Sequence, residues 1–92
     1  MAIFRKKAIE VEAKQFTEQN KDQIYHWARE IQNNIFPSRS SIGESLLMIP
    51  TLQGDMECAI GDWLIVEISL TGERKIYPCK GAIFEQTYEE IK

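Results

Sequence analysis

The segment GDWLIVEISLTGERKIYPC, residues 61–79, decides the fold class because it contains two runs of β-favouring residues separated by a turn. The first run, residues 63–69, places apolar side chains on both faces near its start, which is typical of a strand covered on two sides. Thr71-Gly72 supplies the turn, and a second run follows at 74–79. The segment therefore predicts an antiparallel hairpin whose first strand lies at the centre of a sheet.

Further short runs of strand-forming residues precede this hairpin. Breaks at Gln53-Gly54-Asp55 and at Gly61-Asp62 bound strands expected at 46–51 and 55–59. Apolar and charged residues alternate from Lys7 to Phe16, which predicts a first strand with one face in water. Together these patterns predict about five strands.

The segment from Asn20 to Gln32 has a helical period instead. Residues spaced at about 100° form an apolar stripe on one side of this helix, consisting of Ile24, Trp27, Ala28, Ile31 and Ile35. Asn20 is the expected N-cap, with Gln23 closing a capping box, and Thr17 is the alternative cap one turn earlier. The pair Asn33-Asn34 suits the helix end. We therefore expect an amphipathic helix that packs its stripe on the sheet.

These elements predict an α+β fold. A small single domain, residues 1–92, has a mainly antiparallel sheet of about five strands packed against one amphipathic helix. Residues Pro37–Ser45 include several turn-forming types and are expected to form a mobile loop. The pattern of residues 82–92 fits a helical turn, a short strand or a tail, and does not decide among them.

Composition excludes several classes of protein. Of the 92 residues, 43% are hydrophobic and 27% are charged, as in ordinary soluble domains. No apolar run approaches the roughly 20 residues that a membrane-spanning helix needs. The N-terminal residues also lack the apolar core of a signal peptide. We therefore expect a cytoplasmic protein that does not enter a membrane.

Charge and cysteine content limit the kinds of ligand and partner that the sequence predicts. The formal net charge of −3 argues against general nucleic-acid binding, which needs a concentrated basic surface. Two cysteines, Cys58 and Cys79, and the single histidine His26 are too few for a four-ligand zinc site. In a reducing compartment both cysteines are expected to act as small buried hydrophobic residues. The sequence thus predicts neither a metal nor another cofactor.

Residue types that often do chemistry have simpler roles in this sequence. His26 falls on the helix side opposite the apolar stripe, which predicts a solvated side chain. Asp62 follows Gly61 at a strand entrance, where glycine and aspartate favour a turn. Cys79 precedes Lys80, which favours a nucleophilic thiolate, but the sequence defines no partner base. We therefore predict that the protein is not an enzyme.

Three longer motifs of the chain are FRKKAIEVEAKQFT, LLMIPTLQGDMECAIGDW and GDWLIVEISLTGERKIYPCKGAIFEQTYE. They resemble YRKKPVVIEAIQWT, IPTLEGDM-x-A-x-PGDY and PGDYII-x-G-x-x-GE-x-YPCKPDIFE-x-TYE, which are patterns of small proteins carried by tailed phages and prophages of Gram-positive bacteria. The resemblance spans nearly all of the chain except the helix and the loop after it. This chain departs from the patterns where Ile60 replaces a proline, Trp63 replaces a tyrosine, and Gly81-Ala82 replaces Pro-Asp.

The resemblance implies a phage or prophage accessory protein that acts by binding in the host cytoplasm, and it brings no catalytic residues. A host or phage protein is the first partner expected. An oligomeric protein that binds or sequesters a small, nucleotide-like ligand is the alternative. A virion structural or assembly component is a further one.

The residues themselves suggest one binding set, which consists of Arg74, Tyr77 and Lys80. Loops on a rigid sheet often carry function, and these side chains offer charge-assisted bonds to an anionic group together with aromatic contact. The alternative is that Tyr77 packs under the strand while the two cations keep the sheet edge soluble.

Overall fold

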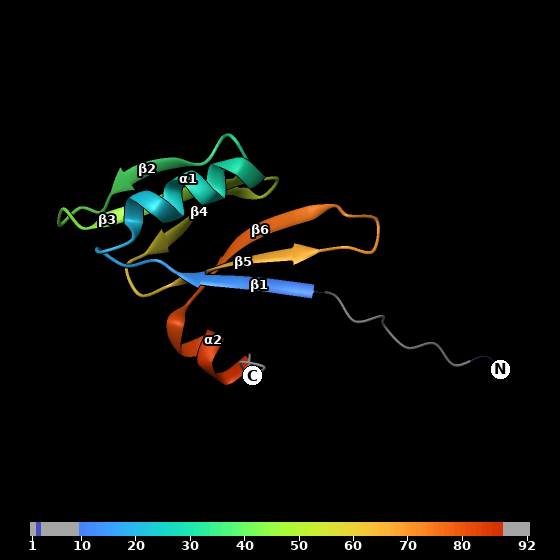
Figure 1. Cartoon of the computed structure of the whole chain (residues 1–92). Helices are drawn as coiled ribbons and strands as arrows, with labels where there is room; N and C mark the ends of the chain where they lie inside the picture. Colours follow the sequence, from blue (N-terminus) through green and yellow to red (C-terminus); the bar gives the residue numbers. More distant parts are fainter. Residues whose placement is uncertain (1, 3–9, 88–92) are drawn as a thin grey trace.

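The computed structural model describes residue 2 and residues 10–87 (Figure 1). Within them, six strands form two three-stranded antiparallel sheets, and two helices accompany the sheets, so the expected α+β class is confirmed. The elements in chain order are β1 (Glu10–Gln15), α1 (Lys21–Ile31), β2 (Phe36–Arg39), β3 (Ser45–Thr51), β4 (Gly54–Ala59), β5 (Trp63–Ile68), β6 (Arg74–Cys79) and α2 (Gly81–Thr87).

The first sheet has the order β1-β5-β6 and contains the predicted hairpin. Strand β5 pairs with β1 on one side and with β6 on the other, and its residues Leu64, Ile65 and Val66 are all buried. The prediction of a central strand covered on both faces is therefore confirmed. The first predicted strand is found as β1, and residues 7–9 of that prediction lie outside the described residues.

The second sheet, with the order β2-β3-β4, corrects the expected loop at Pro37–Ser45. The first residues of the expected loop belong to β2, where Pro37 lies opposite Leu47 of β3. An edge strand tolerates proline because the missing N–H removes no bond from the interior of the sheet. Only residues 40–44 turn, and Gly43 adopts a φ of +84° there. A tight hairpin thus replaces the predicted mobile loop.

The chain passes from one sheet to the other at the Gly61-Asp62 turn. Gly61 has a φ of +95°, which an L side chain rarely adopts, and its N–H donates to the Phe16 carbonyl at 2.7 Å. The Asp62 carboxylate accepts a hydrogen bond from the Ala59 N–H at 3.0 Å. The predicted turn role of this pair is confirmed, and the turn also makes the strands divide between two sheets.

Helix α1 presents its apolar stripe to the core as predicted. Ile24 and Ala28 are buried, and Trp27 packs against them with part of its surface exposed. The capping box is wrong: the Asn20 side chain makes no bond to the first turn of the helix. It instead accepts from the Thr17 N–H at 2.8 Å, while the Thr17 hydroxyl accepts from the Asn20 N–H at 3.2 Å. The two predicted caps therefore bind each other and fix the β1-to-α1 connection.

One apolar cluster joins α1 to both sheets. Its buried members are Phe16, Ile24, Ala28, Ile35, Leu47, Ile49, Cys58, Leu64, Val66 and Ile76. Because these residues come from elements of both sheets, the two sheets and α1 share one core. Helix α1 also contacts β6 of the first sheet.

Helix α2 settles part of the undecided C-terminal pattern. Residues Gly81–Thr87 are helical, and the remainder of that prediction lies outside the described residues. The Phe84 ring stacks on the Trp63 ring with a centroid distance of 4.1 Å and an interplanar angle of 10°. Neither this helix nor α1, among the residues described, has the length and apolar character to cross a bilayer.

Candidate functional site

The structure spreads the three residues of the sequence-predicted binding set along β6. Arg74 begins the strand and is exposed, whereas Lys80 follows its last residue. Six residues of extended chain span about 20 Å, so these two cations do not meet at one small anion. Between them, the Tyr77 hydroxyl donates to a Glu67 carboxylate oxygen at 2.8 Å. Lys80 Nζ lies 3.2 Å from Asp62 Oδ2.

The other residues considered for chemistry have structural positions. His26 is exposed on α1, as predicted, and its ring centroid lies 5.4 Å from that of Tyr25. Cys58 is fully buried, and this burial, with the nearby Asp62 carboxylate, raises the pKa of its thiol to about 12. Cys79 is half-buried, so burial as a core residue is confirmed for Cys58 and only in part for Cys79. Among residues 10–87, no three His, Cys, Asp or Glu side chains gather as metal ligands would.

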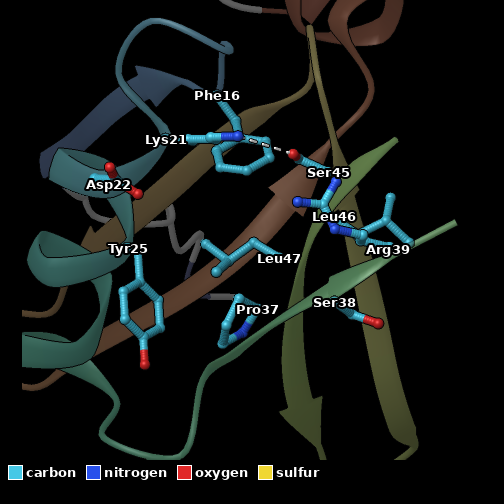
Figure 2. A pocket seen from close by; sticks show the side chains of 10 residues that line it. All are labelled: Phe16, Lys21, Asp22, Tyr25, Pro37, Ser38, Arg39, Ser45, Leu46 and Leu47. Carbon is cyan, nitrogen blue, oxygen red and sulfur yellow. Dashed lines mark hydrogen bonds between the residues drawn. The ribbon is translucent and has the colours of Figure 1, made fainter. Parts of the chain in front are cut away.

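A groove lies elsewhere, between α1 and the β2-β3 hairpin (Figure 2). It has a volume of about 510 Å³ and is partly open to solvent. Small-molecule sites typically measure about 300–1,000 Å³. Its lining residues are Phe16, Lys21, Asp22, Tyr25, Pro37, Ser38, Arg39, Ser45, Leu46 and Leu47.

One end of the groove carries a cationic layer, which we define as Lys21, Arg39 and Ser45. Figure 2 shows Lys21 reaching from α1 and Arg39 from β2 toward Ser45. Lys21 Nζ donates to the Ser45 hydroxyl at 3.3 Å, and Ser45 is itself buried. Arg39 donates to the Gly43 carbonyl at 3.0 Å, which ties its guanidinium to the hairpin turn. Two positive charges therefore enter the groove from opposite walls.

Glu18 completes the electrostatics of this end. Its carboxylate lies 3.1 Å from Lys21 Nζ. The hydrogen bond from Lys21 is the main cause that lowers the pKa of Glu18 below its usual 4.5, and Ser45 and Arg39 act in the same direction. The cationic layer therefore already pairs with one exposed carboxylate of the protein itself.

The other end carries an apolar layer, which we define as Tyr25, Pro37 and Leu47. These side chains stand together in Figure 2, below the cationic layer. Arg29 donates to the Tyr25 hydroxyl at 3.0 Å, and its guanidinium carbon lies 5.5 Å from the Tyr25 ring centroid. Arg29 therefore contacts both the hydroxyl and the ring of Tyr25.

The sequence did not predict the groove, because the groove residues lie in segments that were expected to be a solvated helix face and a loop. Lys21 and Tyr25 flank the apolar stripe of α1 and have the pattern of a solvated face. Arg39 and Ser45 belong to the predicted loop. The usable signal was the spacing of two residues between Pro37 and Arg39 and between Ser45 and Leu47, because residues two apart on a strand share a face.

No protein-family model matches this chain, and no curated protein and no solved structure matches it either. The resemblance to phage and prophage proteins therefore rests on the three quoted motifs alone. Phe16, Leu46 and Leu47 of the groove lie within the quoted motifs, whereas Lys21, Tyr25 and Arg39 lie in the helix and the segment after it, which the resemblance does not cover.

Proposed function

We propose that the protein is a non-enzymatic binding protein that captures a small anionic ligand in the groove between α1 and the β2-β3 hairpin. The observation that carries this proposal is the cationic layer, in which Lys21 and Arg39 approach the buried Ser45 hydroxyl from opposite walls. A lysine ammonium, a guanidinium and a hydroxyl all donate hydrogen bonds, and bonds to an ionised acceptor are about twice as strong as neutral ones.

The overall acidity of the chain does not oppose this proposal. The net charge of −3 describes the whole surface, whereas exposed charges beyond about 10 Å are largely screened at ordinary salt. Two carboxylates lie near the cationic layer: Glu18, which pairs with Lys21 outside the groove lining, and the exposed Asp22, which lines the groove. A ligand anion therefore competes with Glu18 for Lys21, whereas the Arg39 guanidinium has no ion pair among the described residues.

The test is titration of the protein with inorganic phosphate and pyrophosphate at low ionic strength, followed by NMR. We expect Lys21→Met and Arg39→Met each to weaken binding about tenfold, because each removes a charge-assisted donor. Binding to the unchanged protein should also weaken as salt is added.

Arg74→Met is the matched control, because it removes an exposed cation on β6 that does not line the groove. It also tests the sequence-predicted set. If Arg74→Met or Lys80→Met loses anion binding while Lys21→Met and Arg39→Met keep it, the anion site lies on β6 and not in the groove. If neither phosphate nor pyrophosphate shifts any NMR signal of the protein, the proposal is overturned.

A protein partner is the second candidate, in agreement with the phage context that the motifs imply. Two large hydrophobic side chains of the β2-β3 hairpin are exposed, Phe36 at 41% and Ile42 at 78%. Phe36 lies opposite Met48, and neither residue lines the groove. Light scattering of the unchanged protein and of Phe36→Ser tests whether a second copy of this chain binds there.

A further inference from the structure

We infer that the groove selects a ring-bearing phosphate of the size of a nucleoside monophosphate, with its phosphate in the cationic layer and its ring in the apolar layer. This inference rests on the proposed function and adds the class of ligand. Its basis is the way in which both walls of the groove change from charged to apolar at the same depth.

The β2-β3 register sets this change on the sheet wall. Arg39 lies opposite Ser45, and two residues further along the hairpin Pro37 lies opposite Leu47. Residues two apart share a face and lie about 6.6 Å from each other along a strand. One cross-strand pair of the sheet wall is therefore polar, and the next pair on the same face is apolar.

Helix α1 repeats the change on the facing wall. Lys21 and Tyr25 are four residues apart, so they share a helix face at a separation of about 6 Å along the axis. This spacing nearly equals the spacing of the two strand pairs. The polar residues of the two walls therefore face each other, and so do the apolar residues, as Figure 2 shows.

The cationic layer fits a phosphate better than a carboxylate. A phosphate monoester presents three strong acceptor oxygens and a charge of about −1.5 to −2, whereas a carboxylate presents two oxygens and a charge of about −1. Three side chains of the layer carry donors. Within the described residues, Glu18 and Ser45 each take one of the three N–H donors of Lys21, which leaves the third for a ligand oxygen.

The apolar layer fits a flat ring. Tyr25 offers an aromatic face whose orientation Arg29 fixes, and Pro37 and Leu47 offer apolar surface from the sheet side. Aromatic side chains gain from offset stacking beyond the burial of area, and their rigidity limits the entropy cost of binding. A ligand that lacks a ring would leave this layer in contact with water.

The experiment measures dissociation constants of four probes, which are inorganic phosphate, phenyl phosphate, adenosine monophosphate and adenosine. We expect at least one of the two ring-bearing phosphates to bind about tenfold more tightly than inorganic phosphate, and adenosine to bind far more weakly than its monophosphate. Comparison of phenyl phosphate with adenosine monophosphate distinguishes an aryl phosphate from a nucleotide as the source of this chemistry.

Two substitutions of Tyr25 locate the ring. Tyr25→Ala should reduce the affinity of the ring-bearing phosphate about fivefold and leave inorganic phosphate unchanged, whereas Tyr25→Phe should retain the affinity for both. Gln23→Ala is the matched control, because Gln23 is exposed on α1 and does not line the groove. Equal losses for both probes in Tyr25→Ala would show a structural role for the ring and overturn the inference.

The outcomes separate this inference from the proposed function. Equal affinity for inorganic phosphate and for both ring-bearing phosphates would overturn the ring layer but keep the anion site. Binding of adenosine as tightly as its monophosphate would overturn the assignment of the phosphate. Absence of binding by all the phosphates would overturn the proposed function together with the inference.

Discussion

Gly81 lies so close to Gly61 that a methyl group on residue 81 would stand 2.8 Å from the Gly61 carbonyl oxygen. The same carbonyl accepts a hydrogen bond from the Gln15 side-chain amide at 3.0 Å. The start of α2 thus packs directly on the turn through which the chain passes between its two sheets. Where the phage-protein motif that this sequence resembles has proline, this chain has the one residue type that lacks a Cβ.

Gly81→Ala should therefore destabilise the protein by about 1–3 kcal/mol, since the new methyl group meets backbone that must move to make room. Urea unfolding monitored by circular dichroism measures this loss. Gln86→Ala, an exposed change on the same helix, is the control and should stay within about 0.5 kcal/mol of the unchanged protein. Equal stability of the two variants would show that α2 does not pack on the turn in solution.

The Asp62 and Lys80 side chains should contribute unequally although they contact each other. Asp62 is only 7% exposed and accepts the Ala59 N–H, so Asp62→Ala should cost about 1–3 kcal/mol by leaving that donor without its partner. The side chain of Lys80 is 66% exposed, so Lys80→Ala should cost less than about 1 kcal/mol. Thermal unfolding of both variants checks the order, and a larger loss for Lys80→Ala would contradict it.

The fold could be predicted where one local pattern determined one element. The central position of β5 followed from apolar residues on both faces, and the stripe of α1 followed from its period. Strand β2 was missed because Pro37 is a turn residue by type, while its edge position makes proline acceptable. The division into two sheets was missed because the turn residues at Gly61 predict that a new strand follows, but they do not specify which sheet that strand joins.

The candidate groove was beyond sequence reasoning for a related reason. Its two layers depend on the register between β2 and β3 and on the rotation of α1 about its axis. The hairpin turn sets the register, and tertiary packing sets the rotation. Conversely, the binding set on β6 was suggested by the nearness of Arg74 and Lys80 in the sequence, but an extended strand separates them by about 20 Å.

Glu18→Gln should strengthen anion binding in the groove about threefold, because the substitution removes the carboxylate that competes for Lys21. The pKa of Glu18 is lowered, so its contact with Lys21 is present above the ordinary value of 4.5 and is lost as pH falls through the lower folded value. An NMR titration of the Glu18 carboxyl should accordingly have its midpoint below 4.5. Glu30→Gln, an exposed change elsewhere on α1, is the binding control. Weaker phosphate binding in Glu18→Gln would indicate that Glu18 supports the groove instead of competing for it.

Cys58 should make the protein sensitive to alkaline pH. The pKa of its thiol is about 12 in the folded protein, against the ordinary value of 9.0, because burial and the Asp62 carboxylate oppose the thiolate. The stabilisation is fully present below pH 9.0 and is lost as pH rises toward 12, since the unfolded chain ionises first. At pH 10.5 this loss amounts to about 2 kcal/mol.

Cys58→Ala removes the titrating group, so the change in unfolding free energy between pH 8 and pH 10.5 should be about 2 kcal/mol smaller in this variant than in the unchanged protein. Comparison of the two pH values within each variant cancels the cost of the small cavity, and Cys79→Ala serves as the control. A thiol reagent at pH 8 should correspondingly label Cys79 and leave Cys58 unmodified until the protein unfolds. Rapid modification of Cys58 in the folded protein would show that the core opens at this position, which would also remove the reason for the alkaline loss.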